Sequence, residues 1–249
     1  MAGHSKWANI KHRKGRQDAK RGQLFAKLAK AIEIAAREGG GSVEFNTSLA
    51  TAVDKAKAND MPNDNIERAI KRGTGEVEGA AYEEMYYEGY GPGGVALYVH
   101  ILTDNRNRAA SDVRSTFTRY NSSLGEPGSV GYLFSQKGMI LAKGVEDNVM
   151  LAALEAGAED VRDAGDGMFE VVTQASDLRQ VKEALTVAGL HIESADVTQL
   201  PSNLVPVEES EAKKLLRLIE ALDDLDDVQE VYSNYDIDDA VMEKVLAEA

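Results

Sequence analysis

Cysteine is missing from all 249 positions of the sequence, and histidine occurs only four times. Without cysteine the chain can form no disulfide, thiolate metal site, iron–sulfur cluster or cysteine nucleophile, and this composition fits a reducing compartment. The histidines are His4, His12, His100 and His191, and no two have the four-residue spacing that puts two metal ligands on one helix face. We therefore expect neither a metal site nor a cofactor.

Long apolar runs are also missing. The most apolar run, residues 94–102, is too short to span a bilayer, and the amino-terminal residues lack the continuous apolar stretch of a secretory signal. The sequence therefore favours a cytoplasmic protein without a membrane partner. A basic segment can also dock on anionic lipid, but only Trp7 and Ile10 are available to insert, so a membrane anchor is the weaker interpretation.

Catalytic signatures are absent as well. No Ser/His/Asp order, paired carboxylates or nucleophile motif stands out, which predicts a non-enzymatic protein without a small-molecule substrate. The glycine-rich residues 89–94 precede a strand-like segment rather than a helix or a Lys-Ser pair, so they predict a hairpin turn and not a phosphate loop. The acidic run Asp223, Asp224, Asp226 and Asp227 lacks the glycine and the ligand spacing of a calcium loop, and we expect a solvated helix end.

Positive charge is concentrated at the amino-terminal end of a chain whose formal net charge is −14. Residues 1–72 contain 15 Lys and Arg against 8 Asp and Glu, a net of +7, and the other 177 residues carry a net of −21. Six of the eleven residues 11–21 are basic, and only Asp18 is acidic. This segregation indicates a surface that holds a polyanion, and nucleic acid is the commonest polyanion that such a segment meets.

The first third of the chain has a helical pattern. Residues 1–22 are polar and basic and can bury little by themselves. Helices are predicted at 23–38, 46–58 and 64–73, the last with a capping box from Asp64 to Glu67. The first helix has an apolar face and an opposite basic stripe, formed respectively by Leu24, Phe25, Leu28, Ile32 and Ala35 and by Lys20, Lys27, Lys30 and Arg37.

From residue 81 the pattern changes to strands. Strands at 82–88, 95–103 and 129–135 and a helix at 106–120 are followed, over residues 139–200, by the order βαββαβ of a ferredoxin-like unit. The remaining short strands and helix cannot form a separate domain, so we expect them to complete the sheet begun at residue 82. The predicted fold is α+β with three domains: a basic arm plus helical bundle (1–78), a middle α/β domain (79–136 and 204–249) and a ferredoxin-like domain inserted into it (137–203).

The candidate nucleic-acid-binding residues come from three regions. In the amino-terminal arm they are Lys6, Trp7, Lys11, His12, Arg13, Lys14, Arg16, Lys20 and Arg21. The first helix adds Lys27 and Lys30, and the predicted helix after the second strand adds Arg106, Arg108, Arg114 and Arg119. Cations of this kind contact phosphates, tryptophan can stack on a base or sugar, and the arginine fork suits phosphate oxygens.

Each region also has a structural interpretation. The arm can be a solvated tail that improves solubility, and Trp7 can fix it to the chain's own domain. The lysine stripe can be the ordinary polar face of an amphipathic helix. The four arginines can pair with the acidic carboxyl half of the chain.

Several motifs are long enough to be specific. They are MAGHSKWANIKHRK (residues 1–14), MPNDNIERAI (61–70), YEGYGPGG (87–94), TDNRNR (103–108), and Leu124-Gly125 with GSV at 128–130. These motifs closely resemble the YebC family of bacterial proteins, and the resemblance covers essentially the whole chain. It implies a helical domain followed by two α/β domains, one inserted in the other. Ala109, Ala110 and Ser111 depart from the hydroxyl-bearing residues of many members, so Asn105 or Asn107 is expected to cap that helix.

The resemblance also implies a function. Members are labelled probable transcriptional regulators, some are described as binding promoter DNA, and mitochondrial relatives act as translational activators. We expect a DNA-binding transcriptional regulatory protein. The alternative is a ribosome-associated translation factor that grips RNA through the same arm, and the absence of a helix-turn-helix or zinc finger favours this alternative. A third possibility is a protein–protein adaptor that uses the acidic α/β domains.

Overall fold

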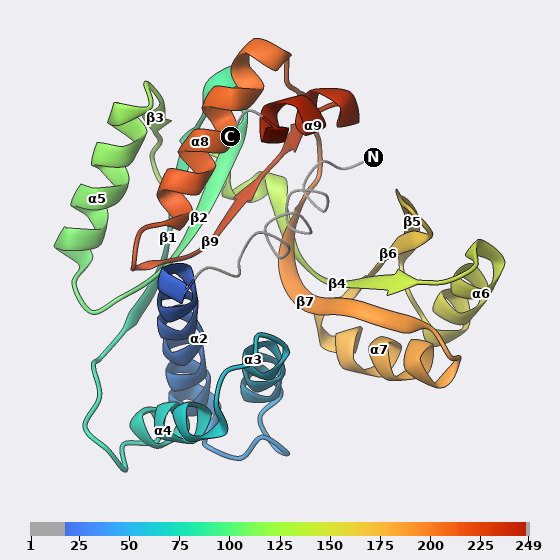
Figure 1. The fold of residues 1–249 in the computed structure, drawn as a ribbon. Coiled ribbons are helices and arrows are strands. Elements are labelled where there is room, and N and C mark those ends of the chain that lie inside the picture. The colour runs from blue at the N-terminus through green and yellow to red at the C-terminus, as the bar shows by residue number, and fades with distance from the viewer. Residues whose placement is uncertain (1–17, 248–249) are drawn as a thin grey trace.

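Residues 18–247 are described by the structure, which is a computed structural model (Figure 1). Helices lead the described chain, and two separate four-stranded sheets follow. Each of these three parts has its own cluster of buried apolar side chains. The predicted fold class, α+β with three domains and a ferredoxin-like insertion, is therefore confirmed.

The helical domain consists of α2 (Asp18–Gly39), α3 (Thr47–Ala58) and α4 (Asn63–Gly73). The face predicted to be apolar on the first helix is buried, since Leu28 and Ile32 share a cluster with Leu49 and Val53 of α3. The helices thus bury their apolar stripes against one another, as amphipathic helices in water must.

Asn46 fastens the end of α2 to the start of α3. Its side-chain oxygen accepts a hydrogen bond from the Leu49 N–H at 3.0 Å, and its side-chain nitrogen donates to the carbonyls of Ala35 at 2.7 Å and Gly40 at 2.8 Å. One buried amide therefore caps one helix and satisfies the last carbonyls of another, which fixes the angle between them.

The capping box predicted from Asp64 to Glu67 is wrong. Pro62 is the N-cap residue of α4, and no side-chain hydrogen bond closes this end. Because the helix begins at Asn63, Asp64 lies inside the first turn instead of at the capping position. There its carboxylate lies near the positive end of the helix dipole.

The sheet of the middle domain has the order β3-β1-β2-β9. Its strands are β1 (Glu83–Tyr90), β2 (Ala96–Thr103), β3 (Ser123–Leu124) and β9 (Val228–Ser233). β1 and β2 form the predicted hairpin, and Gly93 and Gly94 have φ of 74° and 75° in the connecting 3-10 turn (Pro92–Gly94). Glycine adopts this left-handed backbone at little cost. β9 pairs with β2, so the carboxyl-terminal part does return to the first sheet.

Three helices cover one face of this sheet: α5 (Arg106–Arg119), α8 (Glu209–Asp223) and α9 (Asp239–Ala247). Leu97, Val99 and Ile101 of β2 are buried in the cluster that contains the apolar residues of all three. No helix was predicted after β9, so α9 is a helix that the sequence analysis missed. Two short strands, β8 (Val205–Pro206) and β10 (Tyr235–Asp236), form a parallel pair, and β10 directly precedes α9 in the chain.

The inserted domain has the ferredoxin-like order β5-β6-β4-β7, with every neighbouring pair antiparallel. Its elements are β4 (Phe134–Lys143), α6 (Glu146–Ala156), β5 (Asp160–Gly165), β6 (Met168–Gln174), α7 (Leu178–Val187) and β7 (His191–Pro201). A 3-10 turn (Ala175–Asp177) precedes α7. Phe134 pairs with Pro201, so the two ends of the insertion leave the middle domain side by side.

The strand predicted at 129–135 is wrong in its first half. Residues 131–133 form a 3-10 turn, and β4 begins only at Phe134. The cause is Glu88 on β1, whose carboxylate accepts hydrogen bonds from the backbone N–H groups of Gly128, Val130 and Gly131 at 2.6–2.7 Å. Amides that point at a carboxylate cannot join a ladder of strands.

These three bonds determine the ionisation of Glu88. Burial by itself favours the neutral acid, but the bonds from Gly128, Val130 and Gly131 outweigh it and lower the pKa of Glu88 below its ordinary value. The motifs at 87–94 and 128–130 thus meet in space and brace the turn that leads into the insertion.

Glu88→Gln is expected to destabilise the middle domain by roughly 2–3 kcal/mol, because hydrogen bonds to a charged acceptor contribute about 1.5–3 kcal/mol. Since the pKa of Glu88 is lowered on folding, this stabilisation is present at neutral pH and is lost as the pH falls through the folded-state pKa. Urea unfolding of both proteins at neutral and acidic pH measures it. Glu126→Gln, an exposed neighbour in the same turn, is the control; equal effects of the two substitutions contradict the assignment.

Candidate nucleic-acid interface

The basic stripe of α2 lies against an acidic loop, residues 223–227, which joins α8 to β9 (Figure 1). The Lys27 ammonium donates to the Asp223 carbonyl at 2.5 Å and lies 3.5 Å from its carboxylate. The Lys30 ammonium donates to the Asp226 carbonyl at 2.8 Å. Both lysine side chains are mostly buried by this contact. Part of the predicted phosphate surface is therefore already occupied by the chain's own anionic loop.

Asp227 is the centre of this contact. Its carboxylate accepts hydrogen bonds from Lys30 Nζ at 3.0 Å, Thr103 Oγ1 at 3.0 Å and Arg108 Nη2 at 2.8 Å. These donors come from α2, from the end of β2 and from α5. The Asp227 side chain is only 7% exposed, so one buried carboxylate joins the helical domain to the middle domain.

The cluster pairs the buried Asp227 carboxylate with the mostly buried Lys30 and the half-exposed Arg108. Burial would raise the pKa of Asp227, but hydrogen bonds from Arg108, Lys30 and Thr103 outweigh it and lower the pKa below its ordinary value. The Arg108 pKa is raised by its bonds to Asp104 and Asp227. Both partners therefore stay charged at neutral pH, and removal of Asp227 takes away the carboxylate that faces the mostly buried Lys30 ammonium.

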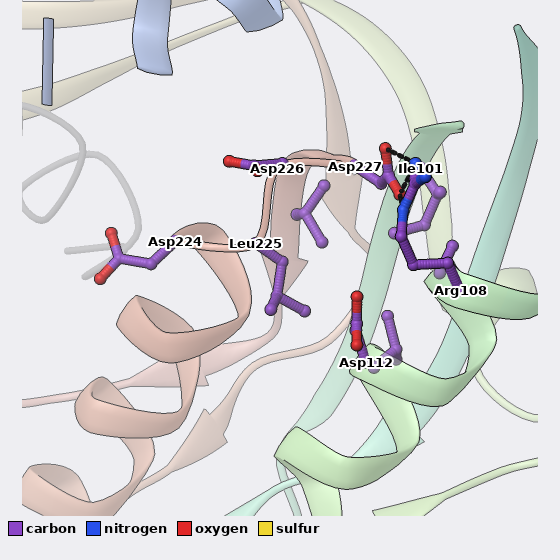
Figure 2. A pocket seen from close by; sticks show the side chains of 10 residues that line it. Ile101, Arg108, Asp112, Asp224, Leu225, Asp226 and Asp227 are labelled. Carbon is purple, nitrogen blue, oxygen red and sulfur yellow. Dashed lines mark hydrogen bonds and ion pairs between the residues drawn. The ribbon is translucent and has the colours of Figure 1, made fainter. Parts of the chain in front are cut away.

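A shallow hollow of about 210 Å³ opens beside this cluster. Figure 2 shows the guanidinium of Arg108 directed at Asp227, with Asp112 and the acidic loop around the same space. Asp224 and Asp226 also line the hollow. A phosphate group would meet mainly like charge here, so the hollow is unsuited to an anionic ligand.

The expectation that the acidic run is a solvated helix end is wrong for Asp223 and Asp227. Asp224 and Asp226 have exposed side chains, as predicted, but Asp223 and Asp227 are turned toward Lys27, Lys30 and Arg108. The physical reason is the opposite charge of α2 and α5, which pack on either side of the loop.

The helix α5 is capped as expected: Asn105 accepts a hydrogen bond from the Arg108 N–H at 3.1 Å. Its arginines divide into two groups. Arg106 lies 3.4 Å from Glu83 in an exposed pair, and Arg108 is bound to Asp104 and Asp227. Arg114 and Arg119 are exposed, and neither has an ion pair within residues 18–247.

Most of the predicted arm lies outside the described residues. This group contains Lys6, Trp7, Lys11, His12, Arg13, Lys14 and Arg16, together with the side chain of Lys20. The guanidinium of Arg21 is exposed and lies 5.4 Å from the centre of the Phe25 ring, a cation–π geometry.

The structure also shows exposed cations that were not among the predicted nucleic-acid-binding residues. Lys57, Arg68 and Lys71 are exposed and have no ion pair among the residues that the structure describes. Arg68 and Lys71 lie one turn apart on α4, opposite the buried Ile66. In the sequence, the position of these two residues two and five places after Ile66 already indicates an exposed face of the helix.

The structure is that of a multidomain α+β protein. Its basic helical domain is joined through the Asp227 ion group to an acidic body made of two sheet domains. Two family models match the chain: "TACO1/YebC protein N-terminal domain" over residues 5–76 and "TACO1/YebC second and third domain" over residues 82–235. The chain belongs to the TACO1/YebC family, which confirms the resemblance found in the sequence.

Similar proteins match over their full length. A protein of Halothermothrix orenii is 53% identical over 254 residues, covering 100% of both chains, and one of Desulfatibacillum aliphaticivorans is 56% identical, covering 98% of this chain and 100% of the relative. Both are named "Probable transcriptional regulatory protein". The crystal structure of a conserved hypothetical protein from Aquifex aeolicus has a TM-score of 0.81 and 46% identity over 89% of this chain and 93% of that one.

Asp227→Asn is expected to loosen the contact between α2 and the middle domain, at a cost of about 3 kcal/mol for breaking a buried ion group. Amide hydrogen exchange should accelerate at the α2 end near Lys27 and Lys30. Because the pKa of Asp227 is lowered on folding, the contact is present at neutral pH and is lost as the pH falls through the folded-state pKa. Asp224→Asn is the matched control; unchanged exchange in the Asp227 variant contradicts the role of this carboxylate.

Proposed function

We propose that this chain is a non-enzymatic regulator that binds nucleic acid, with DNA-binding regulation of transcription as the leading function. The observation that carries the proposal is the separation of charge: residues 1–72 have a net charge of +7 in a protein of −14. The names of the relatives support a regulatory role. A duplex carries one phosphate charge per about 1.7 Å and is attracted to such a basic end.

The described contacts indicate which cations are available to phosphates. Lys27, Lys30 and Arg108 are bound to the acidic loop, so a phosphate must compete with carboxylates for them. The exposed cations Arg21, Lys57, Arg68 and Lys71 face no such competition within residues 18–247. We therefore assign phosphate binding to the arm and to this second group. The acidic body repels the duplex from other directions.

Translation is the second candidate, favoured by the exposed Arg114 and Arg119 on α5. They belong to the middle domain, separate from the basic helical domain. Two separate basic surfaces suit a folded RNA, which proteins recognise by shape and phosphate position without a base-reading helix. A ribosome offers such a surface.

We further propose that the protein works in the cytoplasm, with neither a membrane nor a small-molecule substrate as its partner. The cysteine-free composition fits a reducing compartment. Among the helices of residues 18–247, none has the length and apolarity to cross a bilayer.

A salt titration of duplex DNA binding tests the role of the arm. If about six phosphates are neutralised, the logarithm of affinity should fall against the logarithm of salt concentration with a slope of about −5. Replacing Lys11, Arg13, Lys14 and Arg16 by alanine should make this slope shallower by roughly 3.6, since each contact contributes about 0.9. The same number of substitutions in the body, Arg179, Lys182, Lys214 and Arg217 to alanine, is the control. Equal slopes for both variants contradict the proposal.

Co-sedimentation with purified ribosomes at physiological salt separates the two candidates. Transcriptional regulation predicts DNA binding with little ribosome association. Strong ribosome association together with weak, sequence-indifferent DNA binding replaces the first candidate by the second. Failure to bind DNA, RNA and ribosomes even in dilute buffer contradicts both.

A further inference from the structure

The helix α6 of the inserted domain has apolar side chains on two opposite faces. Val149 and Ala153 are fully buried against the sheet and α7. Met150, Leu151 and Leu154 lie on the outward face and belong to none of the apolar clusters that the described residues form. Leu151 is 59% exposed and Leu154 is 75% exposed. A helix that covers one sheet needs only the first apolar face, so the second contributes nothing to the described core.

The exposed apolar surface continues at the start of α6. Val145 immediately precedes α6, Val187 ends α7, and both are exposed. A Cβ atom on Gly144 would lie only 2.7 Å from the Leu190 side chain, so the start of α6 and the end of α7 are neighbours. Single exposed apolar residues are ordinary, but a group of them on one helix pair marks an interaction site. We call the following residues the apolar stripe: Val145, Met150, Leu151, Leu154 and Val187.

The charges around the apolar stripe are all negative along α6. Residues 144–161 contain five acidic residues and no Lys, Arg or His. Asp147 and Glu155 each lie four positions from Leu151, which places one carboxylate a turn before it and one a turn after it on the same face. Neither these carboxylates nor that of Glu146 has a side-chain partner within residues 18–247. They are therefore free to accept cations from another molecule.

Complementary charge selects the kind of molecule that fits. The inserted domain, residues 137–203, has 5 basic and 12 acidic residues, a net of −7. A second copy of the same face would bring like charges together, and a nucleic acid would meet carboxylates with its phosphates, both of which are unfavourable. A protein surface with apolar residues bordered by Lys and Arg matches both the apolar area and its charge.

The shape of the surface favours a helical partner. Met150 and Leu154 lie one turn apart with Leu151 beside them, which forms a ridge of the kind that packs into the groove of another helix. In Figure 1, α6 lies at the outer end of the inserted domain, away from the helical domain. A helix can therefore approach α6 without displacing the described contacts of the helical domain.

We propose that the apolar stripe docks a helix of another protein, one that presents a row of apolar side chains flanked by Lys or Arg. Leu151 and Leu154 are the apolar anchors, and Asp147 and Glu155 pair with the flanking cations. The inserted domain is then a protein-binding domain. This docking goes beyond the proposed binding of nucleic acid and does not depend on it, because the phosphate-binding cations belong to the helical domain and the arm.

A synthetic helix tests the docking on the full-length protein. The probe is a fluorescent peptide with leucines along one side and lysines on both flanks, and its control has glutamates in place of the lysines. Fluorescence anisotropy should show binding of the lysine probe only. Leu151→Ser with Leu154→Ser, the stripe variant, should weaken this binding roughly tenfold or more. Val43→Ser with Phe45→Ser is the matched control in the loop between α2 and α3, where Phe45 is 84% exposed, and should leave the affinity unchanged.

A second pair of variants separates the local carboxylates from net charge. Asp147→Asn with Glu155→Gln should weaken binding of the lysine probe several-fold and reduce its dependence on salt, because two cations of the probe lose their partners. Glu38→Gln with Glu44→Gln removes the same charge from exposed positions of the helical domain and should have little effect. Urea unfolding of all variants verifies that each protein is folded.

Several results overturn the docking surface. Equal affinities of the stripe variant and its control show that the stripe is not the contact. Equal weakening by both pairs of charge substitutions shows attraction by net charge alone. A wild-type dimer in sedimentation velocity that the stripe variant abolishes identifies a second copy as the occupant. A change in the emission of Trp7, the chain's one tryptophan, in the stripe variant without probe identifies the chain's own arm instead.

Discussion

The buried carboxylate of Asp227 is the central constraint on how the helical domain packs against the middle domain. It accepts hydrogen bonds from Lys30, Thr103 and Arg108, which belong to three elements of two domains. Apolar clusters hold each domain together separately, and they set no orientation between the helical domain and the sheet. A buried ion group does set one, because its donors must all point at the same two oxygens. As a consequence, Lys27 and Lys30 of the basic stripe are paired with carboxylates and are less available to a phosphate.

This internal pairing changes how the charge separation is understood. The basic stripe of α2 is in part the counterion of the acidic loop, so net charge overestimates the positive surface that a polyanion can reach. Glu88 shows the same principle within one domain, since backbone amides neutralise it and the turn before β4 forms around it. Several residues of the family motifs therefore maintain the structure. The phosphate-binding surface must be built from the remaining cations.

Local patterns predicted most of the fold and little of the interface. The hairpin at Gly93 and Gly94 and the Asn105 cap depend on a few neighbouring residues, and both were foreseen. Asp227 meets Lys30 across 197 positions, and no periodicity or spacing relates two such residues. The start of β4 was misplaced for the same reason, because Glu88 captures amides 40 to 43 positions away. α9 was missed because its few apolar residues complete a core formed elsewhere in the chain.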